Sequence, residues 1–261
     1  MELKKICIVM AYYDRQYQLD KTLQSFSESK HDNFSVIIVD DHSPQEIVLP
    51  ELTFDVTILK TPPHKWTNCC HVYNRGFVYA QSMEHDIIVI QSPECYHVGD
   101  VLMHINDNVK DDNYIAYGCF QLDKYTTFSE HDIISLSETN LFRVTTNNDG
   151  LGQNAWWNHT VYQPLPQYWC TALTADNMRS INGIDERFAT GYAVEDGYFL
   201  WQVEKLGLDI QIVDYPFVVH QWHDRLLPEG VPELVKKNQR LYDNLIKQDT
   251  YRSHHCITPD L

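Results

Sequence analysis

Basic residues are few in this sequence of 261 residues, which has 20 Lys and Arg against 36 Asp and Glu and a net charge of −16. A protein that binds nucleic acid needs a basic face, so the charge argues against that class. The same charge repels any phosphate-bearing ligand. Such a ligand therefore has to be held by local donors or by a metal ion.

The sequence also lacks a disulfide framework and a membrane-spanning run. Its seven cysteines are an odd number, none is in a CxxC spacing, and the adjacent pair Cys69-Cys70 is not a zinc-ligand spacing. This cysteine usage indicates a reducing compartment. The start, MELKKICIVMAYYD, has only a short apolar run and predicts neither a secretory signal nor a membrane span. We therefore expect a cytoplasmic protein. A protein peripheral to a membrane and a virus-encoded protein are the alternatives.

Short apolar runs alternate with helical patterns along the chain, and 43% of the residues are hydrophobic. Residues 5–11 and 34–39 are typical of buried parallel strands, and the helical spacing in 16–29 predicts a helix between them. Strand, helix and strand form a right-handed βαβ unit. Further strands are expected at 56–60, 86–90, 114–122, 209–213 and 217–220, and further helices at 66–83, from His97 through 105, and at 231–247. The pattern predicts an α/β fold with a mostly parallel central sheet flanked by helices.

Candidate ligand-binding residues follow the ends of these strands. Ligands bind such sheets beyond the carboxyl ends of the strands, where Ala11, Tyr13 and Asp41 are expected. The Tyr13 ring suits stacking on a planar base, and the Asp41 carboxylate suits an N–H donor of that base. Taken alone, a turn acid and a surface tyrosine are an equally good interpretation.

Paired carboxylates stand out in 180–206, which reads SINGIDERFATGYAVEDGYFLWQVEKL. The glycine and the acids of GIDER suit a compact turn. The apolar spacing that follows places Glu195 and Asp196 on the first turn of a helix, where the helix dipole favours acids. For an isolated acid pair, a purely structural role at a helix start is the alternative.

This stretch resembles the "GGFDE…GxxxED" segment of GT-A glycosyltransferases, in which the ED acid faces the sugar acceptor. Tyr13 and the VDD at Asp41 are similar to the uridine pocket of family 2 glycosyltransferases. Asn74-Arg75-Gly76 resembles the NxG element of the same enzymes, where glycine lets the helix approach the sheet. The resemblance implies a single Rossmann-like GT-A domain with an acceptor-side insertion in 123–166. It divides the chain into a nucleotide-binding half (1–110), an acceptor-binding half (111–225) and a C-terminal helix and tail (226–261).

A metal site is implied at the place of the family's DxD motif, whose carboxylates hold a cation between two phosphates. Here the residues are Gln91-Ser92-Pro93-Glu94, so this chain departs from the pattern and only Glu94 supplies an acid. Ser92 offers an oxygen to the nucleotide or the ion. His220, with His223 as the alternative, resembles the late histidine ligand of metal-dependent members. The resemblance therefore implies Mn²⁺ or Mg²⁺.

Aromatic residues in the acceptor half suit stacking on a sugar. Trp157, Trp169 and Tyr192 are the candidates, and packing into the core is the alternative for the tryptophans. The ED segment is also similar to that of C-terminal galactosyltransferase-type and polypeptide N-acetylgalactosaminyltransferase proteins. Because the latter retain configuration, this motif does not fix the stereochemistry.

The order of these motifs along the chain predicts a glycosyltransferase that uses a nucleotide-diphosphate donor, with a UDP-sugar as the first choice. The acceptor would be a hydroxyl group of a glycan, a protein or a small molecule. Asp196 would act as general base in an inverting reaction, and Glu195 would orient it or hold a sugar hydroxyl. The alternatives are a catalytically decayed nucleotide-sugar-binding module and a sugar nucleotidyltransferase. The latter would need a Gly- and Lys/Arg-rich loop after the first strand, which AYYDRQ is not. We expect no nucleic-acid partner, and a homodimer is one assembly to test.

Overall fold

Four neighbouring parallel strands form the first part of the central sheet. The computed structural model describes residues 3–129, 154–249 and 251–253. In the sheet, β1 (Ile6–Tyr12) lies between β2 (Phe34–Asp40) and β4 (Ile87–Gln91), and β2 pairs with β3 (Asp55–Lys60), all in parallel. Helix α1 (Gln16–Phe26) connects β1 to β2, so the predicted βαβ unit is confirmed.

The second part of the sheet is mixed. It contains β8 (Cys170–Thr174), β6 (Asn113–Gln121), β9 (Asp209–His220), β5 (Cys95–Val98) and β7 (Ala155–Asn158). The strand order is β3-β2-β1-β4-β8-β6-β9-β5, and β7 pairs with β6. Only β6 and β9 are parallel here, while the β4–β8, β6–β8, β5–β9 and β6–β7 pairs are antiparallel. The α/β fold class is confirmed, with more antiparallel pairing than the sequence predicted.

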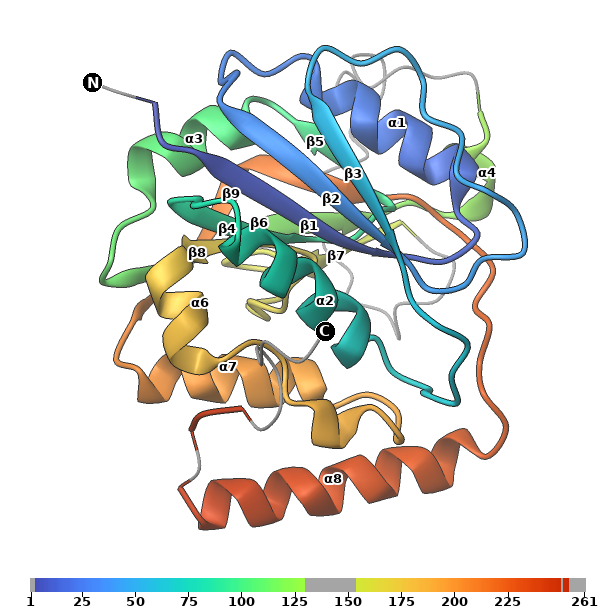
Figure 1. Ribbon diagram of the computed structural model, residues 1–261, viewed down its shortest axis with the longest axis vertical. Helices are drawn as coiled ribbons and strands as arrows, with labels where there is room; N and C mark the ends of the chain where they lie inside the picture. The colour runs from blue at the N-terminus through green and yellow to red at the C-terminus, as the bar shows by residue number, and fades with distance from the viewer. Residues whose placement is uncertain (1–2, 130–153, 250, 254–261) are drawn as a thin grey trace.

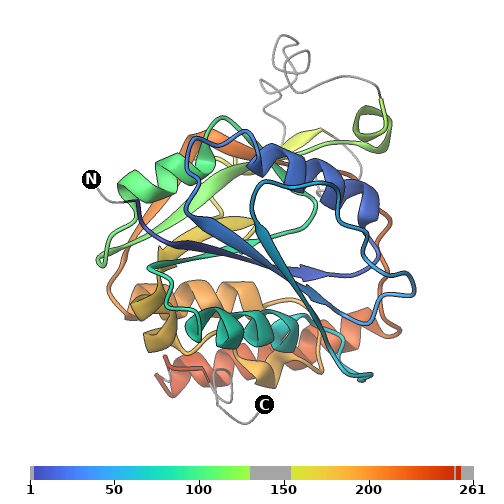
Figure 2. The same ribbon diagram turned by 45° about the horizontal axis from the view of Figure 1, so that its top comes forward.

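Helices cover both faces of the sheet (Figures 1 and 2). One face carries α1 and α3 (Val101–Asn108). The other carries α2 (Cys70–Gln81), α6 (Ala175–Ile181) and α7 (Glu195–Lys205), and α8 (Val231–Lys247) lies outside α7 as the outermost layer. The short helix α4 (Lys124–Thr127) and the 3-10 turn η2 (Glu186–Phe188) complete the described elements.

Alternation along β1 explains why its apolar run is continuous. Ile6, Ile8 and Met10 pack on the side of α1 and α3, whereas Cys7 and Val9 pack on the side of α2 and α7. All five residues are fully buried. A strand that is covered on both faces needs apolar residues at every position, as the sequence pattern indicated.

Helix α2 is shorter than the predicted 66–83 and α1 ends before the predicted residue 29, and two larger differences concern β5 and β9. His97 does not begin a helix: it lies in β5, with its ring 4.6 Å from that of Phe26. Gly99, at φ +78°, ends that strand, and α3 begins only after Asp100. The two strands expected at 209–213 and 217–220 are one strand, β9, with an irregularity in its pairing to β6.

Gly76 brings helix α2 close to the sheet. A Cβ atom at this position would lie 2.3 Å from Val9 Cγ1 on β1. Because Val9 is buried on a central strand, it has little room to move. The prediction that this glycine permits a close helix–sheet approach is confirmed.

The two predicted halves of the chain share one sheet, because β4 pairs with β8 and β5 pairs with β9. Their division into nucleotide-binding and acceptor-binding halves stays a prediction. Residues 130–153, most of the predicted insertion, and the tail at 254–261 lie outside the described residues. None of the helices in the described part of the chain has the length and apolar character needed to cross a membrane.

Candidate nucleotide-sugar site

The four predicted nucleotide-binding residues lie at one edge of the sheet. Ala11 is the next-to-last residue of β1, and Tyr13 directly follows that strand. Asp41 follows β2, and Ser92 follows β4. Since β2, β1 and β4 are neighbours and parallel, their carboxyl ends come together, with Tyr12 opposite Asp40. The sequence therefore placed these residues correctly, while their role stays a prediction.

Asp41 has partners that the sequence did not reveal. Thr61 Oγ1 donates to Asp41 Oδ1 at 3.1 Å, and His64 Nε2 lies 2.5 Å from the same oxygen. Trp66 stacks between His64 and His71, with ring centroids 4.0 and 3.9 Å apart. A flat aromatic surface thus lies beside the carboxylate, while Tyr13 is 39% exposed. Both features suit a planar base.

Glu94, His220 and His223 converge on one point. Their candidate ligand atoms all lie within 4.8 Å of one another. The pairing of β5 with β9 brings them together, because Cys95 is opposite His220 and the backbone N–H of Gln221 donates to the Glu94 carbonyl at 3.0 Å. The sequence suggested Glu94 and His220 only by resemblance. The strand that joins them, β5, was not predicted.

His220 is poised as a neutral ligand. The residue is 4% exposed, and within the described part of the chain its Nδ1 atom has no hydrogen-bond partner. Burial lowers the pKa of His220 well below its usual value, and the charges of His223, Arg225 and Arg15 lower it further. A neutral imidazole with an unpartnered nitrogen beside a carboxylate fits a divalent transition-metal ion. The residues present therefore fit the implied Mn²⁺ better than Mg²⁺, which prefers oxygen ligands.

Gln221, which directly follows β9, is hydrogen-bonded to α1 and to the residues before β5. Its side-chain amide donates to the carbonyl groups of Gln18 and Glu94, both at 3.0 Å. Gln18 in turn donates to the Trp222 carbonyl at 2.8 Å. These bonds hold the start of α1, the residues before β5 and the residues after β9 in one arrangement. His223 is thereby fixed near Glu94, with 3.6 Å between Nε2 and Oε1.

Tryptophans surround His220. The ring of Trp157 lies 4.6 Å from that of His220, and the ring of Trp169 lies 5.6 Å from it. A cavity of about 370 Å³ opens beside them, lined among others by Trp157, Trp222 and Arg225. Trp157 lines this cavity while its ring also contacts Trp169 and His220, and its role in binding an acceptor sugar stays a prediction. Trp222 is a further aromatic wall that the sequence reasoning did not single out, although it stands between the two histidines.

Glu195 is held by two donors at the start of α7. Asn68 Nδ2 donates to Oε2 at 2.6 Å, and the Tyr168 hydroxyl donates to Oε1 at 3.2 Å. Burial, followed by the charge of Asp196, raises the pKa of Glu195 to about 7, although both donors oppose the shift. Glu195 therefore titrates near neutral pH. Sequence reasoning found the acid and missed both of its partners.

Asp196 is half-buried next to Glu195. Its Oδ1 accepts from the backbone N–H of Gly197 at 2.7 Å. Burial raises the pKa of Asp196, and the N–H groups of the first helical turn partly offset this rise. The helix that the sequence predicted from this point is confirmed. A carboxylate whose pKa is raised is a better proton acceptor than a free aspartate.

The backbone that leads into α7 is constrained. Ala193 and Val194 both have positive φ, at +58° and +75°. A β-branched residue is rare in this region, and such strain persists only where surrounding contacts impose it. Asn238 of α8 supplies them: its amide donates to the carbonyls of Ala193, at 2.9 Å, and Phe188, at 3.2 Å. The C-terminal helix therefore sets the approach to the two acids.

Gly191 and Tyr192 lie in the same constrained loop. A Cβ atom on Gly191 would come within 1.9 Å of Asn238 Oδ1, so only glycine fits there. The backbone N–H of Tyr192 donates to the Leu234 carbonyl of α8 at 3.3 Å. Of the three predicted acceptor residues, Trp157 and Trp169 thus lie against His220, and Tyr192 lies in this loop beside α8.

Two tyrosines connect the acid pair to the metal-ligand cluster. Tyr168, which donates to Glu195, has its ring centroid 5.8 Å from that of Tyr73. The Tyr73 hydroxyl donates to the carbonyl of Gln91, at 3.5 Å, directly before Ser92. Burial raises the pKa of Tyr73, and the charge of Glu94 contributes to the rise. Glu94 and His220 therefore meet directly, whereas the cluster found among the described residues does not include Asp196. It is Glu195 that these two tyrosines link towards Ser92.

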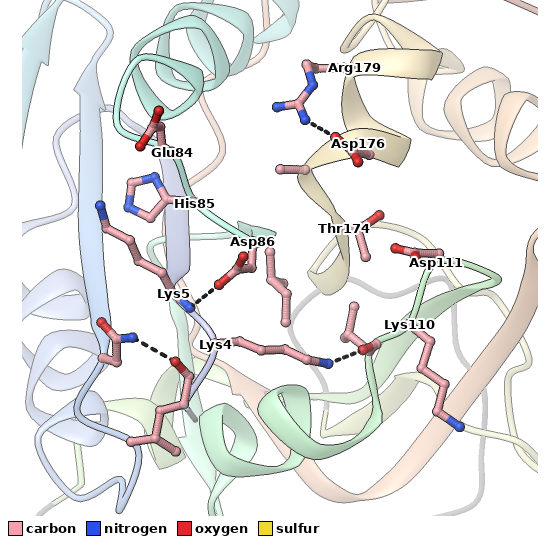
Figure 3. A pocket seen from close by; sticks show the side chains of 15 residues that line it. Lys4, Lys5, Glu84, His85, Asp86, Lys110, Asp111, Thr174, Asp176 and Arg179 are labelled. Atoms are coloured by element: carbon pink, nitrogen blue, oxygen red, sulfur yellow. Dashed lines mark hydrogen bonds and ion pairs between the residues drawn. The ribbon is translucent and has the colours of Figure 1, made fainter. Parts of the chain in front are cut away.

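A larger hollow, of about 890 Å³, lies at the other end of the strands (Figure 3). It is lined by residues just before β1 and β4, such as Lys5 and Asp86, whose backbone N–H and carboxylate are hydrogen-bonded at 2.7 Å. Arg179 pairs there with Asp176. Since ligands of α/β sheets bind beyond the carboxyl ends of strands, this hollow is not the candidate site.

Comparison with protein-family models gives no match, and comparison with curated protein sequences gives none either. Solved structures do match. TarS from S. aureus (residues 1–349) has a TM-score of 0.59 at 11% identity, and its complex with UDP has 0.59 at 12%, each covering 93% of this chain. The mannosyltransferase PcManGT from Pyrobaculum calidifontis, in complex with GDP-Man and Mn²⁺, has a TM-score of 0.54 at 11% identity and covers 95% of this chain. This chain spans 65% of each of those chains. The protein thus has a GT-A-like glycosyltransferase fold.

Proposed function

We propose that this protein is a glycosyltransferase that moves a sugar from a nucleoside diphosphate to a hydroxyl acceptor. The observation that carries the proposal is the convergence of Glu94, His220 and His223 at the sheet edge where Tyr13, Asp41 and Ser92 also lie. The fold shared with TarS and PcManGT supports it. Because a UDP complex of TarS has this fold, a UDP-sugar is our first choice of donor.

In this proposal the nucleotide lies across the ends of β1, β2 and β4. Tyr13 stacks on the base, and Asp41 accepts a hydrogen bond from it once His64 yields that oxygen. The diphosphate then extends past Ser92 towards Glu94. Residues Glu94, His220 and His223 would hold Mn²⁺, which would neutralise the charge that develops on the leaving diphosphate.

Asp196 is the proposed general base. It removes the proton from the acceptor hydroxyl while the oxygen attacks the anomeric carbon, and the bond between that carbon and the diphosphate oxygen breaks. The products are the glycoside, the nucleoside diphosphate and one proton. Attack from the face opposite the diphosphate inverts the configuration. Glu195, already bonded to Asn68 and Tyr168, keeps the start of α7 in place.

The acceptor is proposed to enter past Trp157 and Trp222, which line the cavity beside His220. Aromatic rings bind the C–H faces of sugars, so a glycan acceptor fits this opening. The resemblance of the ED segment to galactosyltransferase and polypeptide N-acetylgalactosaminyltransferase proteins is part of the same proposal. Proton NMR of the first product formed would report whether the anomeric configuration inverts.

Calorimetry with UDP and GDP, with and without Mn²⁺, tests the proposal. We expect one of the two nucleotides to bind, and to bind more tightly with Mn²⁺. Absence of nucleotide binding under all four conditions would overturn the function. Binding without transfer from any nucleotide-sugar would instead favour a decayed binding module.

A further inference from the structure

Arginine side chains gather at the proposed metal site, although the chain as a whole has a net charge of −16. Arg15 Nε lies 3.3 Å from Glu94 Oε1, and His223 Nε2 lies 3.6 Å from the same oxygen. Arg225 lines the cavity beside His220 and His223. A metal-binding carboxylate is therefore already engaged by a guanidinium group.

Arg15 is fixed in this position. It precedes α1 in the loop after β1, and its side chain is 15% exposed. One terminal nitrogen donates to the Asp224 carbonyl at 2.9 Å, and the other donates to the Asp14 carbonyl at 3.2 Å. These bonds connect the first loop to the loop after β9. Two backbone carbonyl groups thus fix the Arg15 guanidinium next to the Glu94 carboxylate, so its position belongs to the architecture of the site.

Arg225 also lines the cavity beside His220. Its guanidinium carbon lies 5.7 Å from the centre of the Trp157 ring, close enough for a cation–π contact. The two guanidinium groups carry permanent positive charge beside the histidines, and Asp224, like Glu94, contributes a carboxylate to the same region. The arginines are therefore the local cations that an anionic ligand could use on an acidic protein.

We propose that Arg15 and Arg225 bind the diphosphate of the donor directly, so that nucleoside diphosphate binding persists without a metal ion. The proposal rests on the function proposed above and specifies how the same site neutralises its ligand. Guanidinium groups match the geometry of phosphate oxygens through paired N–H donors. When the diphosphate enters, Arg15 exchanges the Glu94 carboxylate for phosphate oxygens. Glu94 is thereby released to take a metal ion together with the histidines.

Titration calorimetry with UDP in EDTA is the test, with uridine as the probe that lacks phosphates. The wild-type protein is expected to bind UDP in EDTA. Arg15→Gln and Arg225→Gln should each weaken that binding by about 10- to 100-fold, the range for a hydrogen bond to a charged group, and leave uridine binding unchanged. Arg179→Gln, which removes the same charge at the far end of the sheet, is the matched control and should change neither.

Glu94→Gln separates the arginines from the metal. It removes the carboxylate that competes with the diphosphate for Arg15, so UDP binding in EDTA should be retained or become tighter. The additional affinity that Mn²⁺ gives the wild type should be lost in this variant. If Glu94→Gln weakened UDP binding in EDTA as much as Arg15→Gln does, Arg15 would be a structural partner of Glu94 only, and the proposal would be wrong.

Failure of this inference differs from failure of the proposed function. UDP binding by the wild type with Mn²⁺ but not in EDTA would overturn direct arginine binding and leave the glycosyltransferase proposal intact. Direct arginine binding would also be overturned if Arg15→Gln, Arg225→Gln and Arg179→Gln all bound UDP equally well, and the glycosyltransferase proposal would again stand. If thermal unfolding shows that Arg15→Gln is not folded, Arg225→Gln, whose side chain lies in the cavity wall, decides the outcome.

Discussion

At the end of β9, arginines and histidines lie beside the Glu94 carboxylate, whereas at the start of α7 two half-buried carboxylates are neighbours. The first region has Arg15, Arg225 and two histidines near Glu94, and Asp224 also lines its cavity. The second has Glu195 and Asp196 with raised pKa values, held by Asn68, Tyr168 and the helix backbone. The first region is suited to bind negative charge, and the second is suited to accept a proton. A glycosyl transfer needs both, one for the leaving group and one for the incoming hydroxyl.

The largest expected effect is on the proton-accepting side. Asp196→Asn should lower the rate of transfer by about 10²- to 10⁴-fold, the usual contribution of a general base. UDP binding should stay within a few-fold, since the diphosphate lies at the other region. Steady-state kinetics and calorimetry on one preparation measure both, with Glu233→Gln, an acid in the first turn of α8, as control. If Asp196→Asn kept the full rate of transfer, Asp196 would not be the general base.

On the charge-binding side, Glu94→Gln and His220→Asn should each weaken Mn²⁺ binding by at least about 10-fold, since even outer partners of metal ligands contribute that much. Electron paramagnetic resonance of free Mn²⁺ measures this directly. His42→Asn is the control, because His42 is exposed and asparagine tolerates its φ of +65°. Unchanged Mn²⁺ affinity in both variants would show that the cluster is not a metal site.

The contrast between the regions also explains what the sequence could predict. The strands of the β1, β2 and β4 group were predictable because buried parallel strands are continuous apolar runs, and their ends place Tyr13, Asp41 and Ser92. The acid pair was predictable because a helical pattern follows it at once. The positions of the other site residues depend on contacts between segments that are distant in the sequence.

Contacts between segments distant in sequence were the part that could not be predicted. The short strand β5 brings Glu94 beside His220, and its four residues CYHV show no clear period. Arg15 and Asn68 also meet their carboxylates across the fold, and nothing in their local sequence indicates this. Asn238 of α8 holds the approach to α7 from 45 positions away. Glu94 and His220 were predicted from the resemblance to GT-A glycosyltransferases and not from the hydrophobic pattern of the chain.

A stability test probes the scaffold that holds the two regions together. Gly76→Ala should destabilise the protein by about 1–3 kcal/mol, the usual cost of an added methyl in a packed core. The added Cβ would meet Val9 Cγ1 at 2.3 Å. Gly197→Ala is the control, because its nearest contact, Tyr242, is 3.9 Å away. Urea denaturation of both variants gives the difference, and equal stabilities would contradict the packing argument.

The smallest expected effect is the pH dependence of stability at Glu195. Its pKa of about 7 in the folded protein lies above its ordinary value of 4.5, so its contribution to the free energy of unfolding is fully present below pH 4.5 and is lost as the pH rises through 7. Glu195→Gln keeps an oxygen and a similar shape but cannot ionise. Its melting temperature should exceed that of the wild type at pH 8, with the difference shrinking towards pH 5. If the difference in melting temperature between the two proteins did not change with pH, the pKa of Glu195 would not be raised in the folded protein.

The central claim is that both regions act on one nucleotide-sugar, and acceptor-free hydrolysis tests it most directly. Release of nucleoside diphosphate is measured over a panel of UDP- and GDP-sugars, with wild type and Asp196→Asn side by side. The account predicts slow release from one sugar nucleotide by the wild type, and loss of that release in Asp196→Asn. No release from any of them by a protein that binds neither UDP nor GDP would contradict it.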